Sequence, residues 1–257
     1  MKIKQILDRI KEEDRTTYEH SIRCGNYLAV FAEEQGMGRI DVQNYREAGY
    51  LHDVGKLQVM KYVKSNVNIR ELSEEARKDY KTALTMHVKY SHPILLSISD
   101  CKQEYLDAAD YHHAHNSDPK AGYSIETVRG QSDVTPIKSA IPKVAKMLAI
   151  IDVYDALTDP NRAYRNGALS EEKVHKIMQE NLNNGQFDPH LFKDFYEKVL
   201  PRIKNMTSEE KLNIKLPSDQ KKMLMNMFKE PKQDIYSLKS ELSSDDNMPK
   251  LDKNMNM

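Results

Sequence analysis

Apolar side chains recur every three or four residues through most of the first 200 positions of the chain. This spacing gathers them on one face of an α-helix, whereas a strand would need a two-residue alternation, which no stretch shows convincingly. The pattern predicts helices over residues 18–34, 42–51, 84–98, 105–113, 141–157, 170–182 and 189–200, with Asp41 and Ser170 as N-caps. We therefore expect an all-α helical bundle.

Two segments depart from the helical pattern. Residues 116–139 are rich in turn-forming residues and longer than an ordinary connection, which is typical of a functional loop, so a protein partner that binds through this loop is one expectation. After Leu200 the periodicity weakens, and polar residues from Glu230 onward predict disorder. The expected organisation is an N-terminal extension at 1–16, a folded catalytic domain at 17–205, and a C-terminal helical extension with a disordered tail at 206–257.

The composition excludes several broad classes of protein. The 257 residues include 39 Lys+Arg and 39 Asp+Glu, so no basic footprint for a nucleic-acid polymer is present. Cys24 and Cys101 lie far apart, which argues against a disulfide scaffold or a thiolate zinc site. The N-terminal residues do not resemble a signal peptide, and no apolar run approaches the roughly 18 residues of a membrane span. We expect a cytoplasmic protein with no membrane partner.

Histidine and aspartate residues fall on faces of the predicted helices that should be buried. His52 and Asp53 end one helix, His87 lies on an apolar stripe, His112 and His113 are adjacent near a helix end, and Asp152 follows Leu148 by four residues. Burying such groups is unfavourable unless something compensates them, although each one alone is more often structural than functional. Taken together, the set predicts a metal centre.

The chemistry of these side chains narrows the choice of metal and reaction. A mixture of imidazoles and carboxylates suits Mn, Fe, Zn or Ni better than Mg or Ca, which favour oxygen ligands. Two such cations can share Asp53 and a bridging water, which becomes a hydroxide nucleophile near neutral pH. Lys56, four residues after His52, is then a natural phosphate clamp. Asp155 continues the face of Asp152 and is also interpreted as a capping or hydrogen-bonding residue.

In order and spacing, the motifs of the chain resemble the HD superfamily and, within it, the HD-GYP branch. The resemblance covers residues 18 to about 200. The matching stretches are residues 20–23, 52–56, 87–95, 110–113, 122–123, 151–158, 162–165 and 186–189.

This resemblance implies a helical bundle with a two- or three-metal centre, often of iron or manganese, that hydrolyses cyclic di-GMP to linear or mononucleotide products. Asp53 would bridge the metals and, with Lys56, carry the catalysis. The residues that match the metal ligands of the family are His52, Asp53, His87, His112, His113 and Asp152, with His20 as a ligand of an additional metal in some members. The residues that match substrate contacts are Lys56, Arg162, Arg165 and Tyr123.

Three positions depart from the family pattern. Thr16 stands where a glutamate usually completes a third metal site, so we expect two metal ions. Ala114 replaces the glutamate after the histidine pair, and Ser124 replaces the proline of the Gly-Tyr-Pro motif. We predict a metal-dependent phosphodiesterase for a cyclic dinucleotide, with cyclic di-GMP as the leading substrate. Two alternatives stay open: a hydrolase for another cyclic dinucleotide or nucleotide, and a degenerate HD-GYP module that only binds.

Overall fold

The computed structural model describes residues 1–60, 71–117, 122–125, 141–161 and 167–216. Within these ranges the chain is built of helices and contains no β-strand, and an isolated bridge pairs Ala114 with Gly122. The prediction of an all-α fold is confirmed. No helix in the described part of the chain combines the length and the apolar character needed to cross a bilayer.

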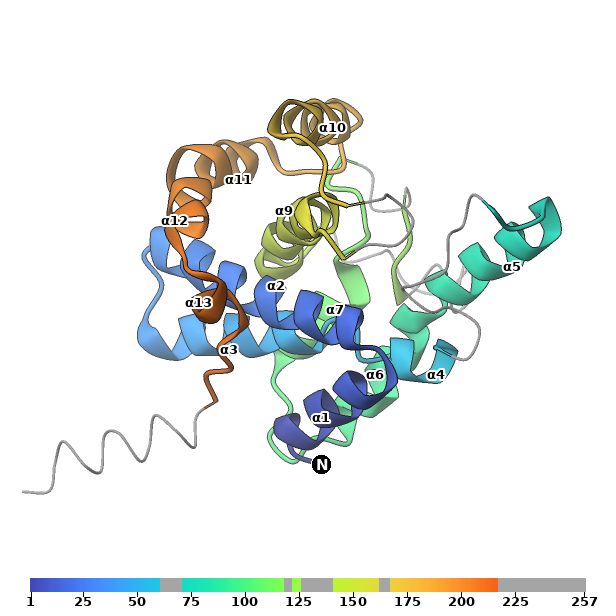
Figure 1. The fold of residues 1–257 in the computed structure, drawn as a ribbon. Helices are drawn as coiled ribbons and strands as arrows, with labels where there is room; N and C mark the ends of the chain where they lie inside the picture. The colour runs from blue at the N-terminus through green and yellow to red at the C-terminus, as the bar shows by residue number, and fades with distance from the viewer. Residues whose placement is uncertain (61–70, 118–121, 126–140, 162–166, 217–257) are drawn as a thin grey trace, which may run out of the picture. The chain divides into compact units, whose positions relative to one another are not determined.

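All helices of the described residues belong to one compact unit, Met1–Ile214, and Lys215–Met257 form a second unit that lies almost entirely outside the described residues. The domain boundaries predicted at residues 16 and 205, and the disordered tail, stay predictions. In chain order the helices are α1 (Ile3–Glu13), α2 (Arg15–Glu34), α3 (Arg39–Leu51), α4 (Lys56–Val59), α5 (Glu74–Thr85), α6 (His87–Leu96), α7 (Gln103–Tyr111), α9 (Lys143–Thr158), α10 (Glu171–Asn183), α11 (Pro189–Asp194), the π-helical turn η3 (Phe195–Val199), α12 (Leu200–Asn205) and α13 (Ser208–Leu212) (Figure 1).

Residues 147–151 in the middle of helix α9 are all apolar and buried, which is typical of a helix at the centre of a fold. Its residues Met147, Leu148, Ile150 and Ile151 are fully buried. The helix packs against α2, α7 and α10 (Figure 1). Because its second half carries acidic residues, beginning with Asp152, the apolar core adjoins a buried polar cluster.

Helices α2 and α3 approach each other closely because glycines face each other where they pack. A Cβ atom on Gly49 would lie 2.6 Å from the Cα atom of Gly25, and a Cβ atom on Gly25 would overlap the ring of Tyr50. Neither position therefore accepts a side chain unless the helices move apart. The close contact holds α2 beside the end of α3, where His52 and Asp53 follow.

The turn after α3 is fixed against α6 by Gly55 and Ser91. The backbone N–H of Gly55 donates to Oγ of Ser91 at 2.9 Å, and the Ser91 hydroxyl faces the carbonyl oxygen of His52 at 3.4 Å. A Cβ atom on Gly55 would overlap the carbonyl oxygen of His87. The turn that carries His52 is thus locked to the helix that begins at His87.

The structure corrects two local expectations and confirms one. The helix expected over residues 84–98 is two helices, since α5 ends at Thr85 and α6 begins at His87. Asp41 is not an N-cap, because Gly38 holds that position and Asp41 lies in the first turn of α3. Ser170 caps α10 as predicted, with its hydroxyl accepting from the N–H of Lys173. The apolar stripe continues across the break between α5 and α6, so periodicity alone does not reveal it.

Candidate metal centre

Histidine and aspartate side chains from five helical segments converge beside the second half of α9. Every residue predicted from the sequence as a metal ligand lies in this cluster. They are His20 from α2, His52 and Asp53 from the turn after α3, His87 from the start of α6, His112 and His113 from the end of α7, and Asp152 from α9.

The potential ligand atoms of these side chains lie a few ångströms from one another. Nε2 of His20 is 3.0 Å from Oδ1 of Asp152 and 3.7 Å from Oδ2 of Asp53. Nε2 of His52 is 3.4 Å from the same Asp53 oxygen, whereas Nε2 of His87 is 3.2 Å from the other one. Both oxygens of the Asp53 carboxylate therefore face imidazole nitrogens.

Among the described residues, three overlapping sets of side chains could each hold a metal ion, because the ligand atoms of each set lie within 4.8 Å of one another. Nitrogen and oxygen donors in such a mixture are typical of sites for transition metals and zinc. Two sets share His52 and two share His112. The sets are His20 with Cys24, His52 and Asp152; His52 with Asp53 and His112; and His87 with His112 and His113.

Hydrogen bonds at Nδ1 fix the orientation of the imidazole rings of His52, His87 and His112. Nδ1 of His52 lies 2.8 Å from the carbonyl oxygen of Gly49, and Nδ1 of His112 lies 2.9 Å from that of Ala108. Nδ1 of His87 contacts a carbonyl oxygen of the preceding turn in the same way. Since a carbonyl oxygen only accepts, each Nδ1 must carry the proton. In the neutral form of each ring Nε2 is then unprotonated, which is the form in which histidine binds a metal.

Burial leaves two atoms of the cluster without hydrogen bonds. His52 is 0% exposed and Asp53 is 1% exposed. Nε2 of His52 and Oδ1 of Asp53 are enclosed and have no hydrogen-bond partner among the described residues. An unpaired buried polar atom destabilises a protein by about 1–3 kcal/mol. A bound cation would satisfy both atoms, so the cluster fits divalent metal ions.

Burial keeps most of the imidazoles neutral. It lowers the pKa of His87 to about 4 and that of His113 to about 3. Burial and the neighbouring His113 also hold the pKa of His112 well below its usual value. His52 differs, because there Asp53 outweighs burial and raises the pKa. At neutral pH, His87, His112 and His113 are therefore ready to bind a cation without first losing a proton.

The two carboxylates of the cluster are ionised. Burial opposes the charge of Asp53, but Lys56 and His52 outweigh it and hold the pKa of that carboxyl well below its usual range. Burial likewise opposes the charge of Asp152, and the hydrogen bond and charge of His20 lower its pKa. The centre thus combines neutral imidazoles with negative carboxylates, which attracts a divalent cation.

Behind His20 lies a buried ion-pair network that connects α2 to α9. Nδ1 of His20 is 2.7 Å from Oδ2 of Asp155. Arg23 donates to both oxygens of Asp155, at 2.6 and 2.9 Å, and to Asp159 at 2.8 Å. Burial opposes the ionisation of Asp155, yet His20 and Arg23 lower its pKa to about 2. The network fixes the ring of His20, and it agrees with the hydrogen-bonding interpretation of Asp155.

Two of the predicted substrate contacts lie at the edge of the cluster. Nζ of Lys56, the first residue of α4, forms an ion pair with Oδ2 of Asp53. The ring of Tyr123 lies 4.3 Å from that of His113, measured between centroids, at an angle of 34°. Arg162 and the other predicted contact, Arg165, lie outside the described residues, as does most of the 116–139 loop.

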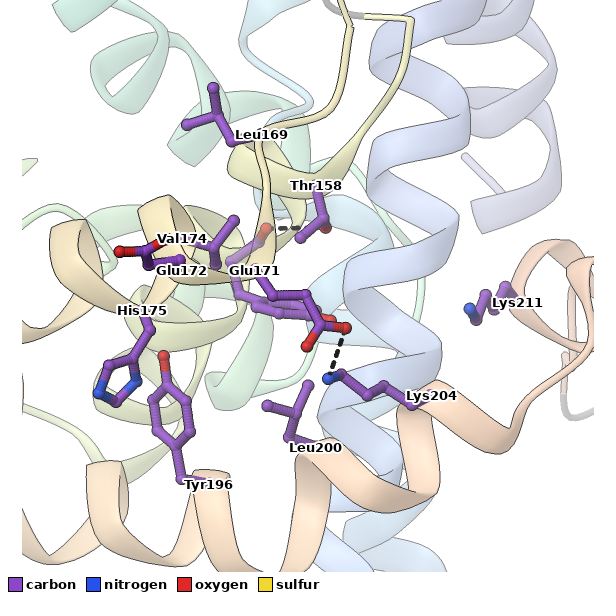
Figure 2. Close-up of a pocket in the computed structure, with 11 residues that line it drawn as sticks. Thr158, Leu169, Glu171, Glu172, Val174, His175, Tyr196, Leu200, Lys204 and Lys211 are labelled. Atoms are coloured by element: carbon purple, nitrogen blue, oxygen red, sulfur yellow. Dashed lines mark hydrogen bonds and ion pairs between the residues drawn. The ribbon is translucent and has the colours of Figure 1, made fainter.

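A cavity of about 520 Å³ lies elsewhere along α9 (Figure 2). Glu171 and Lys204 form an ion pair of 2.8 Å beside it, and within the described ranges the enclosed hydroxyl of Tyr196 has no hydrogen-bond partner. None of the side chains predicted to act in catalysis, and none of the three metal-ligand sets, belongs to its lining. We therefore assign the chemistry to the histidine and aspartate cluster. The cavity is lined by Tyr154, Thr158, Leu169, Glu171, Glu172, Val174, His175, Tyr196, Leu200, Lys204 and Lys211.

Comparison with known families agrees with this geometry. The HD domain family matches residues 17–157, which is more than half of the chain and includes every member of the cluster. The chain belongs to the HD domain family. The HD motif itself is the pair His52 and Asp53, which the fold places at the middle of the cluster, and the predicted membership is confirmed.

Two curated relatives of this HD domain are bacterial phosphodiesterases. A cyclic di-GMP phosphodiesterase of Pseudomonas aeruginosa is 28% identical over 197 residues, covering 75% of this chain and 42% of the relative. The 3′3′-cGAMP-specific phosphodiesterase 3 of Vibrio cholerae is 28% identical over 176 residues, covering 68% of this chain and 34% of the relative. This chain thus spans less than half the length of either relative.

Solved structures with a similar fold include the HD domain of the phosphodiesterase PgpH from L. monocytogenes. In its complex with cyclic-di-AMP, that domain aligns with a TM-score of 0.54 and 19% identity, covering 82% of this chain and all of the domain. The domain in a second structure aligns with the same TM-score and 17% identity, covering 77% of this chain and 97% of the domain. At this identity the likeness establishes the fold.

Proposed function

We propose that this HD domain is a metal-dependent phosphodiesterase of the HD-GYP type that hydrolyses a cyclic dinucleotide, with cyclic di-GMP as the leading substrate. The observation that carries the proposal is the buried Asp53 carboxylate, whose two oxygens each face an imidazole nitrogen, at 3.4 Å for His52 and 3.2 Å for His87. A carboxylate in that position can join two metal ions. Two relatives named as phosphodiesterases for cyclic dinucleotides support the substrate class.

The proposed metal centre holds two divalent ions, with iron and manganese as the first candidates for a set of nitrogen and oxygen ligands. When bound, such ions lower the pKa of water and neutralise the charge of phosphoryl oxygens. Asp53 joins the two halves of the centre, and His20 lies on the side of Asp152. The proposed ligands are His52, Asp53, His87, His112, His113 and Asp152, together with His20.

Side chains at the edge of the centre would bind the substrate. The Lys56 side chain is 16% exposed and lies next to Asp53, so its ammonium group can contact a phosphate held at the centre. Tyr123 lies against His113, so its ring extends an aromatic surface on which a nucleobase can stack. Arg162 and Arg165 are proposed as further phosphate contacts. In the net reaction an oxygen of water bonds to phosphorus, one phosphoester bond breaks, and the leaving oxygen takes up a proton.

The test is hydrolysis of cyclic di-GMP by protein purified without oxygen and loaded with iron or manganese, with linear and mononucleotide products resolved. Wild-type protein should turn over, whereas Asp53→Asn should lose both bound metal and hydrolysis. Asp100→Asn is the matched control, because Asp100 is exposed and lies outside the cluster. Turnover by Asp53→Asn at the wild-type rate would refute the proposal.

A second candidate substrate is another cyclic dinucleotide. One relative is named as specific for 3′3′-cGAMP, one similar structure contains cyclic-di-AMP, and Ser124 departs from the Gly-Tyr-Pro motif. The same assay with cyclic di-GMP, 3′3′-cGAMP and cyclic-di-AMP separates the candidates by their kcat/KM values. Metal uptake without hydrolysis of any of them would redirect the search to other nucleotides, and tight dinucleotide binding by metal-free protein would favour a degenerate binding module.

A further inference from the structure

Cys24 lies inside the proposed metal centre. It follows His20 by one turn of α2 and is 0% exposed. Its thiol is free, and Sγ lies 3.6 Å from Nδ1 and 3.8 Å from Nε2 of His20. Sγ also belongs to the set of ligand atoms within 4.8 Å of one another that includes His20, His52 and Asp152. The sulfur thus lies among the side chains proposed to bind metal.

The spacing of these atoms suits a shared cation. With metal–sulfur and metal–nitrogen bonds of about 2.3 and 2.0–2.1 Å, a tetrahedral angle separates the two ligand atoms by about 3.5 Å. Sγ of Cys24 and Nε2 of His20 are 3.8 Å apart, and Nε2 of His20 is 3.0 Å from Oδ1 of Asp152. Small rotations of the side chains would bring these atoms to bonding distances of one ion.

The His52 side chain of the same set independently indicates a binding site for a cation. His52 is 0% exposed, and its enclosed Nε2 has no hydrogen-bond partner in the part of the chain that the structure describes. The Nδ1 atom of this ring faces the carbonyl oxygen of Gly49, so in the neutral ring Nε2 carries the free electron pair that can bind a cation. A cation between His20, Cys24, His52 and Asp152 would satisfy it.

We propose that Cys24 is a metal ligand of this chain and coordinates one ion as a thiolate together with His20, His52 and Asp152. This inference rests on the proposed metal centre. Coordination replaces the proton of the thiol by the metal ion and releases that proton to solvent. Thr16, one turn before His20 on α2, offers only a hydroxyl group, so the sulfur is the ligand that α2 adds to His20.

A thiolate in the set has a consequence for metal choice. Sulfur is a softer ligand than carboxylate oxygen, so it favours zinc, iron or cobalt over manganese. A cysteine that merely packed as a small apolar side chain would leave this preference unchanged. A ligating Cys24 and a merely packed Cys24 can therefore be distinguished by the metal preference of the protein, without measuring hydrolysis.

The experiment uses Co²⁺ as the probe ion, because a thiolate bound to cobalt adds a charge-transfer band in the near ultraviolet that nitrogen and oxygen ligands do not give. Metal-free protein comprising residues 1–257 is titrated with Co²⁺ alone, and the amount of bound cobalt is measured separately. The variants are Cys24→Ser and Cys24→Val, and Cys101→Ser is the matched control, since Cys101 belongs to none of the ligand sets. Circular dichroism checks that each variant is folded.

Wild-type protein and Cys101→Ser should show the band. Both Cys24 variants should lose it, and one cobalt ion should bind at least about tenfold more weakly, as is common when a metal site loses a supporting group. Cobalt binding without the band in wild type, or a band that survives in Cys24→Ser, would overturn the role of Cys24 and leave the metal centre standing. No cobalt binding at all would overturn both. If the protein shows the charge-transfer band but hydrolyses no cyclic dinucleotide, the result would support Cys24 as a metal ligand and would contradict only the proposed phosphodiesterase activity.

Discussion

The ring of His20 is held by Asp155, whose Oδ2 lies 2.7 Å from Nδ1 of the imidazole. The same carboxylate accepts two hydrogen bonds from Arg23, which hold it in place, so rotation of the His20 ring would break the hydrogen bond to Asp155. A carboxylate behind a histidine fixes the tautomer and raises the basicity of the nitrogen on the other side. Asp155 therefore prepares Nε2 of His20 for a metal ion without lying in the centre itself.

Replacing Asp155 with Asn should weaken metal binding by about 10–100-fold, the usual effect of removing such a partner. The measurement is a competition between the protein and a fluorescent chelator for Mn²⁺ or Co²⁺. Asp159→Asn is the control, because it removes a carboxylate that contacts Arg23 at 2.8 Å in the same network and leaves the Asp155–His20 pair in place. Equal affinities in the two variants would show that the contact with His20 has no such role.

Replacing Lys56 with Gln should slow hydrolysis by about 100-fold, the lower end of the loss found when a group that stabilises transition-state charge is removed. Bound metal should remain close to the wild-type amount, because Lys56 pairs with Asp53 but is not among the metal-ligand sets. Steady-state kinetics and metal analysis of the same sample test both expectations. Lys81→Gln, on an exposed part of α5, should behave as wild type. Unchanged kcat/KM in Lys56→Gln would exclude the phosphate contact.

The metal-free protein should lose stability as the pH falls from about 6.5 to about 4. Burial lowers the pKa of His87 from 6.5 to about 4, so in this interval the unfolded chain binds a proton that the folded chain does not. The free energy of unfolding therefore decreases towards low pH, by about 3 kcal/mol for this one residue. Urea unfolding at a series of pH values measures it. His87→Gln should flatten the slope, and an unchanged slope would exclude His87 as its source.

Replacing Gly49 with Ala should destabilise the protein by about 1–3 kcal/mol or more, because the added methyl group would meet the backbone of Gly25 at 2.6 Å. Separation of α2 from α3 would also move His20 away from His52, so metal affinity should fall as well. Thermal unfolding and a metal titration of the same variant measure the two effects. A melting temperature and an affinity equal to those of wild type would show that the helices can adjust without strain.

Much of the fold was predictable because apolar spacing of three and four residues encodes helices directly. The convergence of His52, Asp53, His87 and Asp152 was also predictable, since polar groups on apolar faces must meet something that compensates them. The position of Cys24 was not, because an isolated cysteine without a nearby partner in the sequence gives no ligand spacing. Only the packing of α2 on α3 and α9 shows which residues surround it.

Other features depend on tertiary contacts that the spacing of apolar residues along the chain does not predict. Helix α1 packs its residues Ile6, Leu7 and Ile10 into the core, whereas the sequence pattern predicts only an N-terminal extension over residues 1–16. The ion pairs of Arg23 join residues more than 130 positions apart, so neither local propensity nor a short motif reveals them.

The hydrogen bond from Gly55 to Ser91, and the close approach of Gly55 to the carbonyl oxygen of His87, hold the segment that carries Asp53 against α6. If the domain binds a cyclic dinucleotide as proposed, separating these two segments would break that contact, so we expect the motion that admits the nucleotide to occur in other parts of the chain. The electrostatic environment at Asp53 is consequently set before a substrate arrives, so little reorganisation remains to be done during the reaction itself.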